Sequence, residues 1–363
     1  MPIATATYEH LAGKMLQVYE EAERKMLRKV SIRLARGIEF KGWTERKYAE
    51  VSAARKEIQA ILDDLRKQRG PLLDSIVTRV FGEGTKAFMT EAERFTDFLG
   101  ITSLSPGSLK AAKILSELYG SLSAADRVIL RKANDAYANI IGGVSAQAVT
   151  GTITVRQAVQ QALNEFSDRG ITSFVDKSGN SWDMATYAEM ATITAISRAT
   201  REGYFDAMAA YGYDLAIVST HAGACPLCDA WQGVVLSVSG NDRKYPSVGD
   251  AEGAGLFHPR CLHHLSVYHE DLHEDARESP QEVDMPSREY TDRQRQRYYE
   301  RQVRRWKRRM AVATDQETER YAYNHVLKWQ ERIRGHIKGV PETIPRKYWR
   351  EGGRQVLKFK KAR

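Results

Sequence analysis

The runs HAGACPLCDAWQG (221–233) and LFHPRCLHH (256–264) contain all three cysteines of this 363-residue chain. Each run holds one pair of polar ligand-type residues at a three-residue step, C-x-x-C in the first and H-x-x-C in the second. Two such pairs, brought together by the loop between them, supply the sulfur and nitrogen ligands that zinc takes in a tetrahedral site. The spacing predicts a structural zinc site at Cys225, Cys228, Cys261 and His258, with His263 or His221 as the competing fourth ligand.

Two other interpretations of the cysteines stay open at this point. In one, they are small buried hydrophobic residues beside histidines that make ordinary hydrogen bonds. In the other, the C-x-x-C pair is redox-active, although no strand–helix pattern of thioredoxin type surrounds it. An odd number of cysteines argues against a disulfide framework.

Short strands are predicted on both sides of the first run. DLAIVST (214–220) leads into it and VVLSVSG (234–240) follows it, while three glycines between 249 and 255 make the loop to the second run flexible. Alternating residues around Ser178-Gly179-Asn180 predict a β-hairpin over 171–184. The β structure is therefore expected to be confined to 171–184 and 214–268.

Helical periodicity dominates the rest of the chain. Apolar residues recur at steps of three and four over 7–36, in a second helix that begins near Thr44, and over 187–212. Breaks are predicted at Arg69-Gly70-Pro71 and at Gly142-Gly143. Two further helices, 291–315 and 316–337, carry apolar stripes that predict a helical hairpin.

The predicted fold class is mainly α (α+β), in four consecutive domains. The domains are a helical arm (1–70), a helical middle with the small hairpin (71–212), a Cys/His β module with an acidic linker (213–285), and a basic helical tail (286–363).

Composition favours a protein without a membrane anchor. No apolar run reaches the roughly 18–20 residues of a membrane span. The first residues, MPIATATYEH, have neither the basic nor the apolar region of a secretory signal, so we expect a protein that matures in a reducing cytoplasm.

The positive charge is concentrated near the C-terminus. Residues 286–363 contain 23 Lys and Arg against 9 Asp and Glu, whereas the preceding 285 residues contain 32 against 37. An arginine-rich helix with interleaved aromatic residues favours sequence-independent contact with double-stranded DNA. An acidic protein surface is the second candidate partner. The alternative without any partner is a helix face that is simply solvated. The predicted DNA-binding residues are Arg301, Arg304, Arg305, Lys307, Arg308 and Arg309.

The segment 187–233, then PRCLHHLSVY (259–268), then the Tyr/Gln/Arg-rich run at 293–310 resemble the minor capsid proteins of tailed bacteriophages. The similarity is to the Mu F-like, portal-associated head-morphogenesis proteins, and most of all to the second minor capsid family. It is best over about 150–335. The positions that match the family's recurring residues are His221, Gly223, Trp231, Gln232, Gly233, Cys261 and His263, while Cys225 and Cys228 stand where many members have no cysteine.

The resemblance implies a low-copy virion protein in the phage head near the portal vertex. Its implied partners are the portal protein, other capsid components and packaged DNA, and its implied role is structural, in head assembly and in genome packaging or delivery. We therefore expect no catalytic residues. The alternative is an enzyme, either an HNH-like zinc-containing nuclease that uses His263 and His264 or a phage-borne effector.

Overall fold

A computed structural model of the chain describes residues 5–92, 108–149, 153–169, 174–175, 181–261, 263–283, 285–342 and 344–352. The chain forms two compact units, each assembled from three separate segments. Unit 1 comprises Met1–Ala12, Gly70–Leu122 and Glu189–Gln294, and unit 2 comprises Gly13–Arg69, Ser123–Ala188 and Arg295–Arg363. The four consecutive domains inferred from the sequence stay a prediction.

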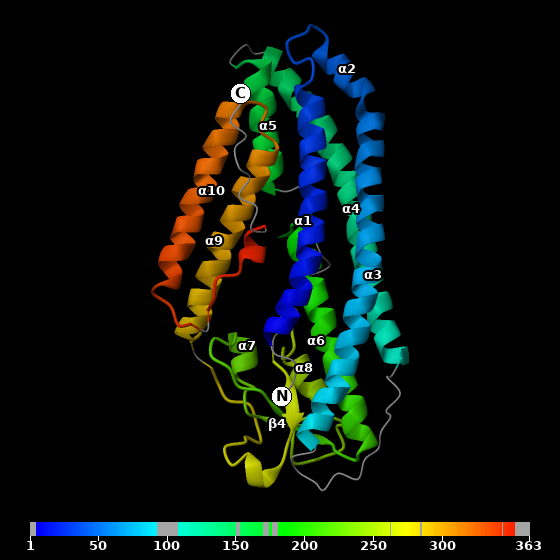
Figure 1. Ribbon diagram of the computed structural model, residues 1–363, viewed down its shortest axis with the longest axis vertical. Helices are drawn as coiled ribbons and strands as arrows, with labels where there is room; N and C mark the ends of the chain where they lie inside the picture. Colours follow the sequence, from blue (N-terminus) through cyan, green and yellow to red (C-terminus); the bar gives the residue numbers. More distant parts are fainter. Residues whose placement is uncertain are drawn as a thin grey trace. The chain divides into compact units, whose positions relative to one another are not determined.

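Long helices make up most of the described chain, and several contribute residues to both units (Figure 1). The helices are α1 (Thr5–Ala35), α2 (Trp43–Ala49), α3 (Val51–Ala92), α4 (Ser108–Val149), α5 (Val155–Arg169), α6 (Met184–Ala210), α7 (Pro226–Asp229), α8 (Val248–Gly253), α9 (Arg288–Ala311) and α10 (Gln316–Ile337), with the 3₁₀ turns η1 (Glu270–Leu272) and η2 (Tyr348–Glu351). The strands are β1 (Phe174–Val175), β2 (Ser181–Trp182), β3 (Leu215–Val218), β4 (Val235–Ser237) and β5 (Leu265–Val267).

These elements confirm the prediction of a mainly α fold with a small β module. The five strands found among the described residues lie within 171–184 and 214–268. β1 and β2 form the expected antiparallel hairpin, whose central Ser178-Gly179-Asn180 lies outside the described residues. The tail also folds into the two expected helices, and α10 has the predicted bounds.

Two predicted helix breaks were wrong, because α3 continues through Pro71 and α4 continues through Gly142-Gly143. A proline inside a helix removes one hydrogen bond and costs about 3 kcal/mol. Around Pro71, buried side chains at steps of four, Leu65, Arg69 and Leu73, continue the inward face of α3 across the proline. Packing of that face outweighs the local cost.

In unit 1, a three-stranded antiparallel sheet of order β4-β3-β5 lies beside α3 and α6. Ile217 of the central strand β3 pairs with Val235 on one side and with Ser266 on the other. The sheet packs into one apolar cluster that also includes Phe88 of α3 and Tyr204 of α6. The two cysteines Cys228 and Cys261 belong to the same cluster, so the Cys/His segment is built into this core.

In unit 2, α9 and α10 pack along the predicted stripes. Their shared cluster consists of Val303, Met310, Ala322, Val326 and Ile333, with Tyr299, Trp306 and Trp329 packed against it. Within the described part of the chain, no helix combines the length and the apolar character needed to cross a membrane.

Candidate metal centre and basic cluster

Two turns of the same design present the predicted ligands in unit 1. Cys225 precedes α7 with Pro226 in the first helical position, and the amide of Cys228 donates to the Cys225 carbonyl at 3.0 Å. In the second turn, the amide of Cys261 donates to the His258 carbonyl at 2.8 Å. Each turn therefore aims the side chains of its first and fourth residues to one side.

The two turns bring four of the predicted ligands together. The Cys225 Sγ lies 2.9 Å from His258 Nε2, and the Cys228 Sγ lies 3.5 Å from the Cys261 Sγ. Ligand atoms of a tetrahedral zinc site lie about 3.5 Å apart, given zinc–sulfur and zinc–nitrogen bonds of about 2.3 and 2.0 Å. The donor types fit a metal ion, but Cys225, Cys228, His258 and Cys261 do not all lie within 4.8 Å of one another. They fall into two three-residue sets that share Cys228.

The structure separates the roles of the histidines that compete for the fourth position. Two sets of ligand atoms each lie within 4.8 Å of one another, one containing His258 with Cys225 and Cys228, the other containing His263 with Cys228 and Cys261. His221 belongs to neither set, although its ring lies 4.1 Å from the His263 ring. His263 contacts the Cys261 sulfur twice, through Nδ1 and through its backbone amide, both at 3.4 Å. The Nε2 of His263 is buried and has no hydrogen-bond partner in the described part of the chain.

Electrostatics of the cluster favour thiolates at its two ends. Hydrogen bonding with Cys228 lowers the pKa of both the Cys225 and the Cys261 thiol, and the hydrogen bond with Cys225 raises the pKa of Cys228. The hydrogen bond with Cys225 also raises the pKa of His258 to about 9. A thiolate is the form of cysteine that binds metal.

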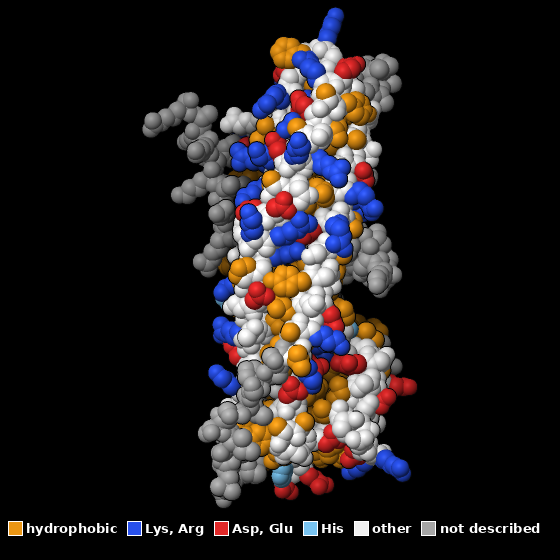
Figure 2. Space-filling view, turned by 90° about the vertical axis from the view of Figure 1, so that its right-hand side faces the viewer, with side chains coloured by type: hydrophobic (Ala, Val, Ile, Leu, Met, Phe, Trp, Pro, Cys, Tyr) orange, Lys and Arg blue, Asp and Glu red, His pale blue; other side chains and the backbone are white. Residues whose placement is uncertain are grey.

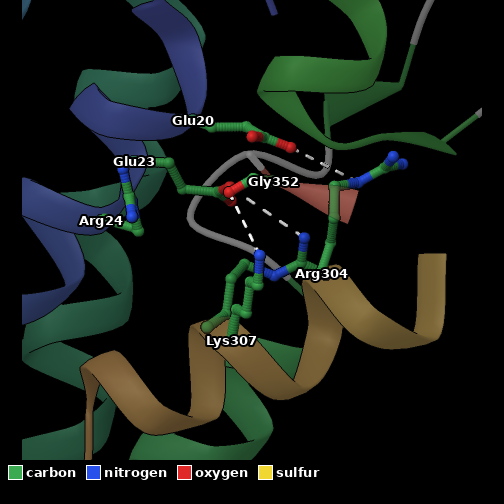
Figure 3. Close-up of a pocket in the computed structure, with 7 residues that line it drawn as sticks. Glu20, Glu23, Arg24, Arg304, Lys307 and Gly352 are labelled. Carbon is green, nitrogen blue, oxygen red and sulfur yellow. Dashed lines mark hydrogen bonds and ion pairs between the residues drawn. The ribbon is translucent and has the colours of Figure 1, made fainter. Parts of the chain in front are cut away.

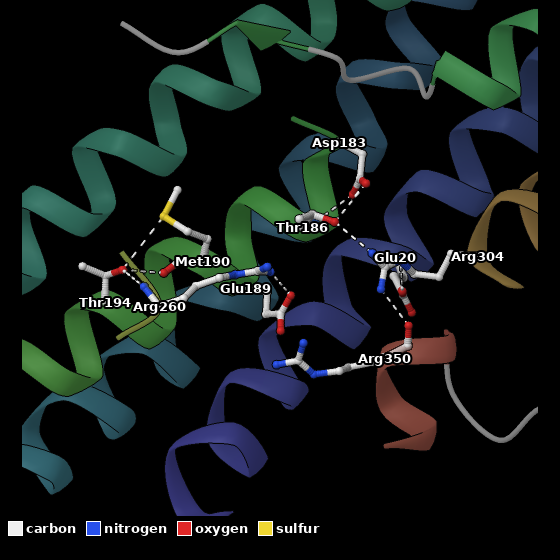
Figure 4. A network of polar contacts seen from close by, with 9 residues as sticks. All are labelled: Glu20, Asp183, Thr186, Glu189, Met190, Thr194, Arg260, Arg304 and Arg350. Carbon is white, nitrogen blue, oxygen red and sulfur yellow. Dashed lines mark hydrogen bonds and ion pairs between the residues drawn. The ribbon is translucent and has the colours of Figure 1, made fainter. Parts of the chain in front are cut away.

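Contacts from α6 hold the second turn in a strained backbone conformation. Phe257 and Arg260 flank His258-Pro259 and both have positive φ, 58° and 70°. The Arg260 guanidinium pairs with the buried carboxylate of Glu189, and its amide approaches Thr194 Oγ1 at 3.4 Å (Figure 4). Such contacts stabilise a conformation that side-chain-bearing residues seldom adopt. Sequence reasoning missed Glu189 and Thr194, because only the folded chain brings α6 to the turn.

The sequence profile of the family described as phage minor capsid protein 2 matches residues 3–338. The chain belongs to this family. It is 29% identical over 192 residues to a protein named "Structural protein" from Lactococcus phage LL-H, an alignment that covers 49% of this chain and 50% of that protein. The chain thus matches about half the length of this relative, and no solved structure matches it. The resemblance identified from the sequence is confirmed.

The structure gives a physical reason for the residues that carried the resemblance. The Gln232 side chain accepts a hydrogen bond from the His221 amide and donates one to Asp229, so it ties the two ends of the first turn together. Gly223 and Gly233 both have φ of +73°, a region that favours glycine. Together they close a compact turn from β3 to β4 in this phage minor capsid family member.

The predicted DNA-binding arginines lie on α9 in unit 2, and most of them contact other parts of that unit. Arg304 is buried and donates to the Arg350 carbonyl at 2.7 Å and to Thr186 Oγ1 at 3.0 Å (Figure 4). Arg308 is buried and donates to the Ser167 carbonyl at 2.9 Å. Each also lies near a buried carboxylate of α1: Arg304 at 3.8 Å from Glu20 and Arg308 at 4.0 Å from Glu23.

The remaining predicted cations differ in exposure. Arg305 and Arg309 share the carboxylate of Asp168 in α5, and Lys307 donates to the Gly352 carbonyl at 3.2 Å. Arg301 is exposed. DNA binding by this set stays a prediction, and the geometry leaves Arg301 as its most accessible member.

Glu20, Glu23, Arg304 and Lys307 line a small pocket in unit 2 (Figure 3). Burial raises the pKa of both Glu20 and Glu23 to about 7, although the neighbouring Arg304 and Arg308 act in the opposite direction. The pocket therefore lies at a buried ionic contact between α1 and α9, and the charge of its two glutamates depends on pH near neutrality.

Proposed function

We propose that this protein is a non-catalytic structural component of the phage virion, present in few copies near the portal and acting in head assembly and in genome packaging or delivery. The observation that carries the proposal is the match of a minor capsid family profile to residues 3–338, which is nearly the whole chain. The partners implied are the portal protein and other capsid components. The long helices, several with extensive exposed faces, suit such docking.

We also propose that the Cys/His cluster holds a structural zinc ion. Cys225, Cys228, His258 and Cys261 would be the ligands, and His263 would donate a hydrogen bond to the Cys261 sulfur. A site closed by four protein ligands is typical of structural zinc, whereas catalytic zinc keeps a position for water. The strands beside it have only three or four residues, so a metal that joins the two turns would contribute directly to the stability of the sheet.

The virion assignment is tested on purified mature particles. Quantitative mass spectrometry should find this chain in the particles at a small fraction of the copy number of the major capsid protein. Particles produced without a functional copy of the gene should show defective heads or reduced DNA content. Finding the protein only in the lysate, with normal particles in its absence, would contradict the assignment.

A further inference from the structure

The two units of this chain carry opposite net charges. Unit 2 contains 42 Lys and Arg against 22 Asp and Glu, a net of +20, whereas unit 1 contains 13 against 24, a net of −11. The sum is the +9 of the whole chain. The positive charge is therefore not confined to the C-terminal tail, because unit 2 also includes much of the N-terminal helix.

An exposed stripe of cations runs along α1 within unit 2. The outward-facing residues of α1 after Gly13 recur at helical spacing, and Arg36, directly after the helix, continues them. They are Lys14, Gln17, Glu21, Lys25, Arg28, Lys29, Ile32 and Arg36, of which only Glu21 is acidic. At about 1.5 Å per residue, the stripe from Lys14 to Arg36 extends over about 33 Å. We call this set the α1 stripe.

The cations of the α1 stripe are available for an outside partner. Lys14, Arg28, Lys29 and Arg36 form no ion pair with any acid in the described part of the chain, and Lys25 lies 3.7 Å from the exposed Asp64. This differs from α9, where Arg304 and Arg308 are buried within unit 2. Exposed, unmatched charge can be neutralised by a ligand without first breaking internal contacts.

The basic character extends from the α1 stripe to the neighbouring helix. Arg33 of α1 binds Glu50 at 3.2 Å and Glu57 at 2.8 Å, which places the start of α3 beside the end of α1. Arg55 and Lys56 of α3 are exposed at this level. On the face that Figure 2 shows, Lys and Arg side chains are frequent among acidic and hydrophobic ones.

We propose that the α1 stripe binds the phosphate backbone of double-stranded DNA. This rests on the proposed place of the protein in a DNA-filled virion. Regularly spaced cations on a rigid helix match a regularly spaced polyanion, and such contacts carry no base specificity. Ile32 is the one exposed hydrophobic residue of the stripe, whereas protein interfaces are usually centred on apolar or aromatic anchors.

The outer face of α10 is the competing surface within unit 2. It also presents exposed cations, Arg320, Lys328, Arg332 and Arg334, with Lys338 directly after the helix, but Glu331 lies among them and Tyr321 and Leu327 are exposed beside them. Between Lys25 and Arg36, the exposed positions of α1 include no acid. The α1 stripe is therefore the better match to DNA.

Two matched variants of the full-length protein test the inference. In the first, Lys25, Arg28, Lys29 and Arg36 are replaced by Gln; in the control, Arg320, Lys328, Arg334 and Lys338 are replaced by Gln. Each removes three exposed cations from one helix of unit 2 and one from the residue directly after it, and glutamine is a good helix former. Melting followed by circular dichroism should show that both variants remain folded.

Binding is measured as fluorescence anisotropy of a labelled random-sequence duplex over a salt series. Each phosphate contact contributes about 0.9 to the slope of log affinity against log salt, so the α1 variant should lose about 3 to 4 units of slope. Its affinity near 100 mM salt should fall by at least about 10-fold, and that of the control by less than about 3-fold. Equal losses in both variants, a loss only in the control, or wild-type protein that does not bind duplex at low salt would overturn the inference.

Two further readouts separate this inference from the proposed function. If the α1 variant binds DNA normally but fails to capture purified portal protein, the α1 stripe is a protein-docking surface and the inference is wrong. Incorporation into particles is then scored for wild type and both variants. Wild-type protein found in virions together with unchanged DNA binding of the α1 variant would refute the stripe and leave the virion assignment standing.

Discussion

Replacement of Gly84 by alanine should destabilise unit 1, because α3 and α6 approach each other there without room for a side chain. A methyl group at Gly84 would lie 2.1 Å from the carbonyl oxygen of Thr200. The contact is reciprocal, since a methyl group at Gly203 would lie 2.1 Å from the carbonyl oxygen of Phe81. Both obstacles are backbone atoms, which no rotamer change can remove.

The size of the effect follows from the distance that the helices must separate. Ordinary contact begins near 3.4 Å, so the helices would have to part by about 1.3 Å. Overpacking of this kind costs about 1–3 kcal/mol. Separation would also weaken the hydrogen bond from Thr85 Oγ1 to the Gly203 carbonyl at 3.1 Å, worth about 1 kcal/mol, while alanine returns about 1 kcal/mol through its helix propensity. We expect G84A to be destabilised by about 1–3 kcal/mol.

Gly82 provides a matched control one half-turn away on α3. Nothing lies within 4 Å of a methyl group placed there, so G82A should be stabilised by up to about 1 kcal/mol. Urea unfolding followed by circular dichroism gives both free energies. In the double variant G84A/G203A, one helix separation relieves both clashes, so the cost should be well below the sum of the single costs. A G84A protein as stable as G82A would refute the helix contact.

Three further predictions concern the metal centre and the buried charges. Elemental analysis should find about one zinc per chain in wild type and none in H258Q, whereas H263Q should keep zinc with an affinity lower by about 10- to 100-fold; equal loss in both variants would make His263 a ligand. Burial raises the pKa of Glu20 and Glu23 to about 7 from 4.5, so the folded state binds their protons more tightly than the unfolded state does. The stability that these two residues contribute should therefore be highest below pH 4.5 and fall as the pH rises through 7. The variant E20Q/E23Q should flatten that profile in thermal melts. Burial alone would raise the pKa of Asp168, but hydrogen bonds from two arginines lower it to about 2. Its contribution to stability should therefore be present above pH 3.8 and disappear toward pH 2. The variant D168N should lower the free energy of unfolding by about 1–3 kcal/mol in urea at pH 7, and should no longer lose stability between pH 3.8 and pH 2 through this residue.

Sequence patterns predicted the parts of this fold that depend on local periodicity. The apolar stripe at steps of three and four defined α10 from Gln316 to Ile337, and the pairing of C-x-x-C with H-x-x-C predicted which side chains meet. The signal for α10 lies within the helix itself, whereas the two ligand pairs are 33 residues apart and were paired by their ligand chemistry. Pro71 shows the limit of local reasoning, because the packing that overrides a helix breaker comes from residues distant in the chain.

The partners of buried charges could not be predicted from the sequence, because they too are distant in the chain. Asp168 lies 137 and 141 residues from the two arginines that it binds, and the sequence around it gives no sign of the pairing. Arg260 is similarly 71 residues from Glu189. Long-range ionic contacts have no periodic signature, so an arginine that lies inside a folded unit looks in sequence like one that faces solvent.

The density of cations is therefore a weaker guide to a polyanion-binding surface than the absence of acids that match them. Arg304 and Arg308 are four residues apart on α9, and α1 carries Glu20 and Glu23 at the complementary spacing of three, so these arginines have partners in their own unit. Burial of such a pair is tolerated because each charge removed from water meets an opposite one. The exposed row from Lys25 to Arg36 has no acid at its own helical positions, and its charge can be neutralised only from outside the helix. This distinction is why we place the proposed DNA contact on α1, although the arginines of α9 are the more numerous in sequence.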